Sequence, residues 1–417
     1  MPEIKPFKGL IYNLTLPIHK LVAPPYDVIS DEERDSLYML HPYNVIRLIL
    51  NKDENRYESA KGYFEKWLND GIIVEREKEA IFVYEQEFEY EEKGYTRSGI
   101  ICLMRLEELG KGNVFPHEKT LPKPKEDRFN LLKATNAQFD HIFGIYSDPN
   151  FVVENIIKVH KPKQPLFDFE FPAGSKIKHK LYEITDENFI HSIIDFFKTI
   201  PIFIADGHHR YETGLMFRDY MRSLSLERDE HNYILMYLTN MESEGLMILP
   251  THRVLTGVDK ENLKKKLFSE DFGKFFDIAE IDTLDELKSF MRKFTRGVFG
   301  VHQIDGKSIV LKIKDYNVIE QSLAPELPQA VKKLDVTILH EFIFRLFQFD
   351  LERVKIIYTH DFKTAVELSK QSDKISFILN PPSVSDVKNV SLSGVTMPQK
   401  STYFYPKLLS GIVMRKF

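Results

Sequence analysis

Residues 202–214 carry the sequence feature that most constrains the fold. The apolar, β-branched run Ile202–Ala205 ends in Asp206-Gly207, and apolar side chains then recur at helical spacing from Tyr211 onwards. This pattern predicts a strand, a tight turn and a helix, with a polar cluster at the N-terminus of the helix. A fold that contains this segment must combine strands with helices.

The polar residues of this turn are suited to bind a phosphate group. The first N–H groups of a helix have no intrahelical partner, and the helix dipole favours an anion there. Gly207 would let the backbone approach the phosphate closely, and Arg210 would clamp phosphoryl oxygens with its planar guanidinium. His208 or His209 could donate to the same oxygens, and Asp206 could hold a metal ion or act as a base.

The same residues also have a purely structural interpretation. Asp-Gly is an ordinary turn signal, and a histidine at the start of a helix more often caps or packs than catalyses. Against this, four further ionisable side chains follow Asp206 within six positions, which is costly to desolvate without a function. We therefore assign catalytic roles to Asp206, His209 and Arg210, and cofactor-binding roles to Gly207, His208 and Arg210.

The composition indicates a globular protein of two or three domains. The chain has 417 residues, of which 43% are hydrophobic and 12% aromatic, enough for packed interiors. The net charge is −5 with both signs interspersed, so we expect no nucleic-acid partner. Cys102 is the one cysteine and lies in a buried strand pattern, which excludes an internal disulfide framework and fits a reducing compartment.

The sequence contains neither a secretory h-region near Met1 nor a run of eighteen apolar residues. We therefore expect a cytoplasmic protein without a membrane partner. The oligomeric state stays open, and a homodimer is one option.

Helix and strand patterns divide the chain into three expected parts. Residues 1–256 form an N-terminal α+β domain, and residues 257–395 form a C-terminal α+β domain. The segment 396–417 begins with the run Met397–Lys407, which is too polar and aromatic for a plain solvent-exposed end, so we expect it to return to the site.

Local patterns predict the individual elements of these domains. Ser30 and Glu33 form the pattern of a capping box for a helix to about Leu40. Lys93-Gly94 joins two alternating strands into an antiparallel hairpin over 80–106. Further helices are expected at 57–69, 127–135, 150–160, 189–199, 260–267, 284–294 and 334–347, and further strands at 141–146, 232–239, 245–250, 297–303, 308–313, 354–358 and 375–379.

A second group of candidate residues lies in the proline-punctuated loop over 115–125. His117, Lys119 and Thr120 could bind a nucleotide, and Glu118 could take the proton from a hydroxyl substrate. The zinc motif His-Glu-x-x-His is absent, so we expect no zinc site. A solvated corner of the surface is the alternative interpretation. Nearby phosphate donors are Lys123, Lys125 and Arg128.

Three further groups of polar residues stand beside predicted strands or rigid segments. The first group follows the predicted strand that ends at Pro250. The second group precedes the aromatic run Tyr403–Tyr405, on which a nucleotide base could stack, and the third group follows the rigid pair Pro24-Pro25. A solvated strand exit, a core anchor and a turn cap are the structural alternatives. The cofactor-binding candidates here are His252, Arg253, Lys400, Ser401 and Thr402, and the substrate-binding candidates are Asp27, Asn44 beside Arg47, and Glu212.

Six segments together resemble a widespread family catalogued as domain of unknown function 1015. They are Ala23–Val28, His117–Thr120, Pro124–Arg128, Ala205–Glu212, Leu249–Arg253 and Met397–Lys407. The stretch Asp206–Arg210 also resembles the Asp-Gly-x-His-Arg signature of the ParB and sulfiredoxin superfamily. That resemblance implies an α+β fold with a ParB/sulfiredoxin-like mixed-sheet core and an additional C-terminal α+β domain. It also implies that the helix start binds nucleotide phosphates.

The superfamily includes free serine kinases, which transfer phosphate from ADP to L-serine with a glutamate base. The resemblance therefore implies a phosphotransferase that uses Mg²⁺ and ADP or ATP, with serine or phosphoserine as the favoured substrate. Asp206 is the candidate Mg²⁺ ligand, Glu118 the favoured base and Glu212 its rival. The alternatives are a regulatory protein that senses a nucleotide without turnover and a phosphomonoester hydrolase. The sequence contains no Walker loop or Gly-rich dinucleotide fingerprint, which disfavours the common nucleotide folds.

Overall fold

The computed structural model describes residues 2–304, 306–349 and 354–417, which form two compact units. Unit 1 contains the chain up to Pro116, then Thr120–Met247 and Pro406–Phe417. Unit 2 contains His117–Lys119 and Ile248–Tyr405. Each unit mixes helices with strands, which confirms the expected α+β class.

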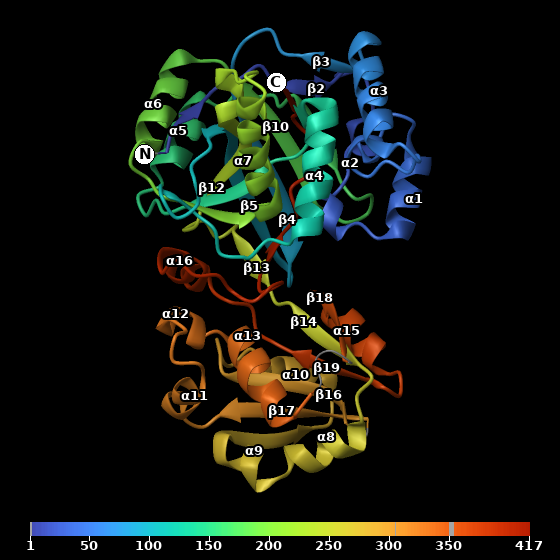
Figure 1. Ribbon diagram of the computed structural model, residues 1–417, viewed down its shortest axis with the longest axis vertical. Helices are drawn as coiled ribbons and strands as arrows, with labels where there is room; N and C mark the ends of the chain where they lie inside the picture. The colour runs from blue at the N-terminus through green and yellow to red at the C-terminus, as the bar shows by residue number, and fades with distance from the viewer. Residues whose placement is uncertain (1, 305, 350–353) are drawn as a thin grey trace. The chain divides into compact units, whose positions relative to one another are not determined.

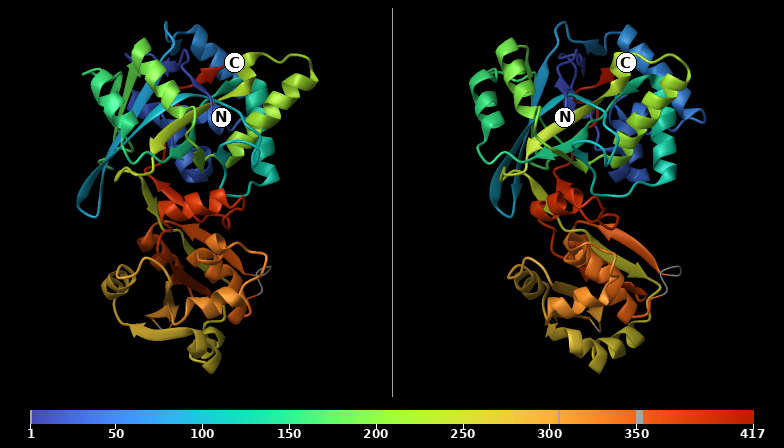
Figure 2. Two further views of the ribbon diagram at one scale, coloured as in Figure 1. Left: turned by 90° about the vertical axis from the view of Figure 1, so that its left-hand side faces the viewer. Right: turned by 60° about the vertical axis from the view of Figure 1, so that its left-hand side comes forward.

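A nine-stranded mixed sheet forms the centre of unit 1 in the described residues (Figure 1). Its strands are β1 (Ile4–Lys5), β4 (Ile81–Tyr90), β5 (Lys93–Arg105), β6 (Val114–Phe115), β8 (Ile142–Tyr146), β9 (Phe167–Glu170), β10 (Lys178–Ile184), β11 (Ile202–Asp206) and β12 (Tyr233–Asn240). They follow the order β6-β11-β8-β12-β5-β4-β10-β9, with β1 beside β5. The predicted hairpin is confirmed as β4 and β5, which Figure 2 shows from two sides.

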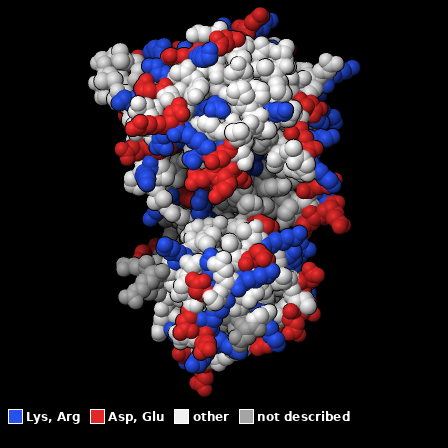
Figure 3. Space-filling model, turned by 90° about the vertical axis from the view of Figure 1, so that its right-hand side faces the viewer, with Lys and Arg blue, Asp and Glu red and all other residues white. Residues whose placement is uncertain are grey.

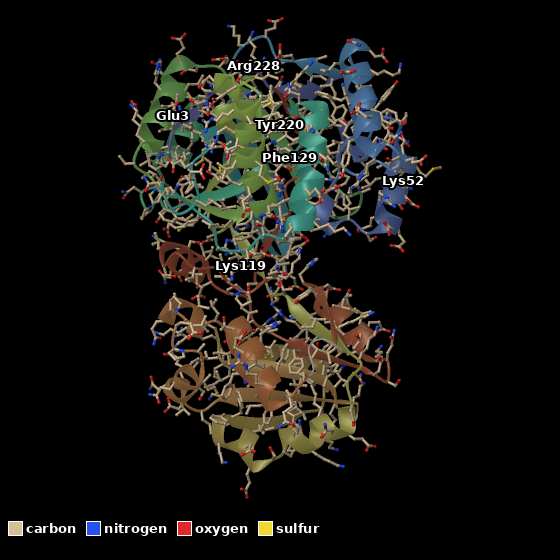
Figure 4. The ribbon with its side chains drawn as sticks, in the orientation of Figure 1. Glu3, Lys52, Lys119, Phe129, Tyr220 and Arg228 are labelled. Atoms are coloured by element: carbon tan, nitrogen blue, oxygen red, sulfur yellow. The ribbon has the colours of Figure 1, made fainter. Side chains whose placement is uncertain are left out.

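The principal helices of unit 1 pack beside this sheet. They are α1 (Asp31–Leu40), α2 (Ile46–Ile49), α3 (Arg56–Asn69), α4 (Pro122–Thr135), α5 (Val152–His160), α6 (Glu187–Phe197) and α7 (His208–Ser223). Helices α4 and α7 lie side by side, and the rings of Phe129 and Tyr220 meet edge to face between them at 5.6 Å (Figure 4). The expected capping box of α1 is confirmed, because Ser30 and Glu33 exchange both hydrogen bonds.

Short pairings complete unit 1. Strand β2 (Leu10–Tyr12) pairs with β3 (Ile73–Glu75), and β7 (Ala137–Gln138) pairs with β21 (Arg415–Lys416). The expected C-terminal segment is therefore divided, with Pro406–Phe417 in unit 1 and residues 396–405 in unit 2. Cys102 is fully buried in the strand that the sequence predicts for it. No helix in the described part of the chain is long and apolar enough to cross a membrane.

Unit 2 contains a six-stranded sheet and several helices. The strands of the sheet follow the order β15-β17-β16-β19-β14-β18. The strands are β14 (His252–Thr256), β15 (Phe276–Ile281), β16 (Val298–Ile304), β17 (Lys307–Ile313), β18 (Lys355–Thr359) and β19 (Lys374–Ile378). A separate pair is formed by β13 (Met247–Leu249) and β20 (Tyr403–Tyr405). The helices include α8 (Lys260–Leu267), α9 (Glu270–Phe275), α10 (Leu284–Met291), α11 (Tyr316–Ser322), α12 (Gln329–Lys332), α15 (Phe362–Ser369) and α16 (Val384–Leu392).

Several expected boundaries differ from the structure. Helix α4 begins at Pro122 and not at 127, because a proline in the first turn of a helix needs no N–H partner. The helix expected over 334–347 is divided into α13 (Asp335–Ile338), a π-helical turn, η4 (Leu339–Ile343), and α14 (Phe344–Leu346). Strand β14 pairs with β18 and β19, so the second sheet begins before the expected boundary at 256.

Candidate functional site

The strand, turn and helix predicted over 202–214 are present as β11, Gly207 and α7. Gly207 precedes the helix with φ +91° and ψ 27°, a left-handed conformation that favours glycine. A Cβ atom here would lie 3.0 Å from Nε and Nη2 of Arg210. The guanidinium of Arg210 therefore lies directly against the turn, and glycine leaves the space that it uses.

Asp206 joins two cations at this turn. Its carboxylate accepts a hydrogen bond from Nζ of Lys407 at 2.7 Å, and it lies 3.6 Å from Nη2 of Arg210. Burial would raise the pKa of Asp206, but the charges of Lys407 and Arg210 hold it well below its usual range. Asp206 is thus ionised and fixes both cations beside the start of α7.

Arg210 lies among carboxylates and is only 11% exposed. Its Nη1 donates to the carbonyl of His141 at 2.5 Å and lies 3.5 Å from Asp140, a distance longer than a hydrogen bond. Burial alone would lower the pKa of Arg210, but Asp140, Asp206 and Asp27 raise it. Because a guanidinium has five N–H donors, Arg210 keeps donors for a further acceptor.

A cavity opens beside Arg210 within unit 1. It is lined by the charged side chains of Arg128, Asp140 and Arg210 and by apolar side chains of α4, β8 and β12. Arg128 donates to Asp127 through Nε at 2.9 Å and to the carbonyl of Ile49 at 2.9 Å. The structure therefore brings two of the predicted phosphate donors, Arg128 and Arg210, to one cavity.

Two residues of α7 connect to the start of α4. Glu212 accepts a hydrogen bond from Oγ1 of Thr120 at 2.8 Å and from Nζ of Lys125 at 2.7 Å. Nε2 of His209 accepts the backbone N–H of Leu121 at 2.9 Å, so this nitrogen is an acceptor here. These contacts tie the predicted loop to the predicted helix, and they engage both carboxylate oxygens of Glu212.

The remaining unit 1 candidates have different surroundings. His208 is buried at the first position of α7, and its charge when protonated would further lower the pKa of Asp206. Asn44 is buried, and its amide donates to the carbonyls of Lys20 and Val22 at 2.8 and 3.1 Å. Asn44 therefore holds the N-terminal segment in place. Asp27 is exposed and raises the pKa of Arg210 through its charge.

A second set of candidates belongs to unit 2. Nε2 of His117 lies 3.0 Å from Oγ1 of Thr402, and Oε1 of Glu118 accepts the backbone N–H of Lys400 at 3.2 Å. Lys119 is exposed, as Figure 4 shows. The segment over 117–119 is thus held by the segment over 397–402, which the sequence alone did not pair.

His252 and Arg253, the next two candidates, occupy neighbouring positions of β14 in unit 2. The ring of His252 is buried and accepts the N–H of Leu379 at 3.3 Å, and burial together with Arg253 lowers its pKa to about 3. It is therefore a neutral core residue. Arg253 lines a cavity together with Ser401.

The candidates thus form two sets, one in each unit. The residues that sequence reasoning did not single out are Asp140, beside Arg210, and Asp335, which lines the cavity of Arg253. Asp140 lies two residues before β8, the strand next to β11, so the position of an acid near the start of a strand was an available signal. Asp335 gave no such signal, because it starts a helix and resembles a cap.

Asp206 is the predicted Mg²⁺ ligand, and the structure does not test this prediction. The described residues contain no group of three or more histidine, cysteine or acidic side chains that could hold a metal ion. The carboxylate of Asp206 already binds Lys407. Mg²⁺ is commonly held by one or two carboxylates together with substrate phosphates, so its binding at Asp206 stays a prediction.

The surface charge offers no extended basic face in the view of Figure 3. Basic and acidic side chains alternate over the described residues of each unit on the side that is shown. The distribution agrees with a net charge of −5 and gives no electrostatic footprint of a nucleic-acid site on that side.

Comparisons with known proteins identify a family but no function. The model of the family described as "Protein of unknown function (DUF1015)" matches residues 4–337. The chain matches no curated protein.

Among solved structures, SbnI with a C-terminal truncation from Staphylococcus aureus is 9% identical, with 74% of this chain and 85% of that chain covered and a TM-score of 0.36. A free serine kinase in complex with AMP is 12% identical, with 72% and 92% covered and a TM-score of 0.34. A conserved hypothetical protein from Pyrococcus furiosus is 11% identical, with 71% and 89% covered and a TM-score of 0.34. Likenesses at this level carry no argument about activity.

Proposed function

We propose that this chain, which belongs to the DUF1015 family of proteins of unknown function, is a nucleotide-dependent phosphotransferase. The nucleotide is ADP or ATP, and the acceptor is a small hydroxylated metabolite, with L-serine or phosphoserine favoured. One observation carries the proposal. The left-handed Gly207 opens α7 against the guanidinium of Arg210, so backbone N–H groups and a fork of donors converge on one point.

The start of α7 supplies positioning and charge. Phosphoryl transfer asks little covalent chemistry of a protein, so binding and neutralising the phosphates provides most of the rate. Arg210 and Lys407 are the cations for this task, and Asp206 keeps both in place through its ion pairs. We also propose that the mixed sheet of unit 1 is the ParB/sulfiredoxin-like core that the Asp206–Arg210 signature implies.

A glutamate acts as the base. It takes the proton of the acceptor hydroxyl while the hydroxyl oxygen attacks the terminal phosphorus, and the shortened nucleotide leaves. Glu118 is the favoured residue and Glu212 its rival. Glu212 accepts hydrogen bonds from Thr120 and Lys125, and Glu118 accepts one from the backbone of Lys400.

One observation favours a second candidate, a nucleotide sensor without turnover. Asp206, Gly207, Arg210 and Lys407 all belong to unit 1, whereas Glu118 belongs to unit 2. Nucleotide binding at α7 therefore uses residues of unit 1 alone. Phosphomonoester hydrolysis in the same place remains the third candidate.

The decisive experiment follows the phosphate. The full-length chain is incubated with ADP or ATP, L-serine and Mg²⁺, phosphoserine is measured by mass spectrometry, and inorganic phosphate is measured in parallel. Phosphoserine supports the transferase, phosphate without phosphoserine supports the hydrolase, and thermal stabilisation by nucleotide alone supports the sensor. If none of the three occurs, the proposal is wrong.

Arg210→Ala tests whether the guanidinium beside the Gly207 turn binds the phosphates. It should abolish turnover and weaken nucleotide binding at least tenfold, because the donors at the turn are lost. Arg222→Ala is the matched control, since Arg222 lies in the last turn of the same helix and is 45% exposed. Circular dichroism checks that both variants stay folded, and unaltered activity of folded Arg210→Ala contradicts the assignment.

Glu118→Gln and Glu212→Gln separate the two candidate bases. Loss of the base should lower kcat by roughly 10²- to 10⁴-fold with little change in nucleotide affinity. The other substitution should leave kcat within a few fold. If both variants retain full kcat, the base is a different residue.

A further inference from the structure

Unit 2 contains a cavity that the phosphotransferase proposal does not use. Its lining comes from the start of β14, residues 295–296 before β16, residues 333–336 around the start of α13, residues 379–382 after β19, Asp386 of α16 and Ser401, all within unit 2. The cavity is small and opens to solvent, so it suits only a ligand of few atoms. Polar groups that line it include Thr251, Asn380 and Ser401.

One wall of the cavity is formed by a buried arginine without an acidic partner. Arg253 is 1% exposed, and it forms no ion pair with a carboxylate in the described residues. Its Nη2 donates to the carbonyl of Lys400 at 3.1 Å, its Nη1 donates to the carbonyl of Thr251, and its Nε donates to Nε2 of His340 at 3.3 Å.

These three bonds leave Arg253 with unused donors. Its guanidinium also lies 5.5 Å from the centre of the Tyr358 ring, which offsets its charge only in part. Three of its five N–H groups have a partner in the described part of the chain, so two remain. Burial lowers the pKa of His340 to about 4, so the imidazole is neutral and does not balance the charge. Burial likewise lowers the pKa of Arg253 itself to about 10. A buried cation in this state favours any anion that can reach it.

Another wall is formed by a buried carboxyl group without a basic partner. Asp335 is 9% exposed, and its Oδ1 accepts the backbone N–H of Gly297 at 2.8 Å. It forms no ion pair in the described residues, and burial raises its pKa to about 7. Arg296, Lys333 and Asp386 also line the cavity. The charge of Asp386 raises the pKa of Asp335 and that of Arg296 lowers it. The guanidinium of Arg296 lies 5.5 Å from the centre of the Tyr316 ring.

The cavity is therefore lined by charges of both signs, with Arg253, Arg296 and Lys333 on the basic side and Asp335 and Asp386 on the acidic side. Arg253 and Asp335 are the buried members of this set, and neither forms an ion pair in the described residues. A ligand with an anionic group alone would satisfy Arg253 and leave Asp335 buried without a cation. A ligand that carries a carboxylate and an ammonium group satisfies both, and each contact becomes a charge-assisted hydrogen bond.

We propose that this cavity binds a small free α-amino acid, with its carboxylate on Arg253 and its ammonium group on Asp335. The polar groups of Thr251, Asn380 and Ser401 suit a short polar side chain. The inference stands without the phosphotransferase proposal, because every residue in it belongs to unit 2 and no nucleotide is involved.

Calorimetric titration of the full-length chain without nucleotide tests the ligand class. The probes are glycine, L-alanine, L-serine and L-threonine, with glycolate, ethanolamine and inorganic phosphate as comparisons. At least one amino acid should bind, and glycolate and ethanolamine, which each lack one of the two charged groups, should bind at least tenfold more weakly. The proposal is overturned if no amino acid binds, or if phosphate or glycolate binds as tightly as the best amino acid.

Two substitutions locate the binding. Asp335→Asn removes the charge but keeps an acceptor for the N–H of Gly297, so it should fold and lose at least tenfold in amino-acid affinity. Arg253→Gln should have the same effect on affinity. Asp282→Asn is the matched control, because Asp282 is 77% exposed in the same unit, and it should bind as the unaltered chain does. Unchanged affinity in Asp335→Asn contradicts the proposal.

The outcomes for the two proposals are separable. Amino-acid binding that is lost in Asp335→Asn but kept in Arg210→Ala supports this site, whatever happens with nucleotides. Nucleotide binding without any amino-acid binding refutes this site and leaves the phosphotransferase proposal to its own test.

Discussion

The two units each hold a buried arginine at a predicted site, and the protein treats the two charges differently. Arg210 in unit 1 has Asp140 and Asp206 within 3.6 Å, and these acids raise its pKa. Arg253 in unit 2 has no acidic partner in the described residues, and burial lowers its pKa. The first charge is balanced by the fold, so it serves as part of a charged framework. The second is left to be balanced by a ligand.

The largest expected effect is a difference in stability when one buried cation is removed from each unit. Lys407→Met leaves the carboxylate of Asp206, which is 18% exposed, without its closest partner and should cost about 3 kcal/mol of unfolding free energy. Arg253→Met deprives no carboxylate and should cost less than half as much. Urea unfolding of the two variants measures both losses. Lys198→Met, in an exposed ion pair, should cause no measurable change.

Equal losses in Lys407→Met and Arg253→Met would mean that the charge of Arg253 is balanced by the protein after all. A larger loss in Arg253→Met would reverse the comparison. Either result would weaken the case for a ligand at Arg253.

The dependence of stability on pH should differ in sign between the two units. The folded state lowers the pKa of Asp206, so its contribution is present above pH 4 and is lost as the pH falls below that value. Burial, together with the charge of Asp386, raises the pKa of Asp335 from 3.8 to about 7, against the opposing effects of the Gly297 N–H and Arg296. The unfolded chain therefore binds fewer protons than the folded chain between these values, and stability falls as the pH rises from 4 to 7.

The slope from Asp335 should approach 1.4 kcal/mol per pH unit at most. Urea unfolding at several pH values, for the unaltered chain and for Asp335→Asn, isolates this contribution by difference. Asp335→Asn should lose the decline between pH 4 and pH 7 and keep the acid-side loss from Asp206. A decline of the same size in both chains would show that Asp335 is not responsible.

The smallest effect is expected at the turn of unit 1. Gly207→Ala places a Cβ at φ +91°, which costs about 1 kcal/mol, and this atom lies 3.0 Å from the guanidinium of Arg210. Gly394→Ala is the matched control, with φ +70° and no neighbour within 4 Å. Thermal unfolding should show similar losses for both variants, while nucleotide affinity should fall only in Gly207→Ala. If nucleotide affinity fell in both variants, the fall could not be attributed to the turn at Gly207.

Sequence patterns predicted much of the fold, because the signals are local. The capping box of Ser30 and Glu33, the hairpin of β4 and β5 and the unit formed by β11, Gly207 and α7 follow from neighbouring residues alone. Short or half-exposed elements were missed, such as β15 and α11, because their apolar residues are too few to define a period. The start of α4 was placed late because proline was interpreted as a helix breaker.

The candidate site divides in the same way. The residue types of Asp206–Arg210 and their place at a helix start could be read from the sequence. The contact of Asp140 with Arg210 and the pairing of the segment 117–119 with 397–402 could not, since both join residues far apart in the chain. Nor does the sequence show that Arg210 has acidic neighbours in the fold and that Arg253 has none within ion-pair distance in the described residues.

The sequence by itself determined that strands and helices alternate here, that the chain has charged residues at a helix start, and that it belongs to its family, because propensity, periodicity and motif depend on residues close together. Only the tertiary structure decided which buried charges are balanced. The energy of a buried ion depends on what lies within a few ångströms of it in space. Lys407 thus reaches Asp206 across 201 positions of the chain, while Arg253 and Asp335 line one cavity and form no ion pair in the described residues.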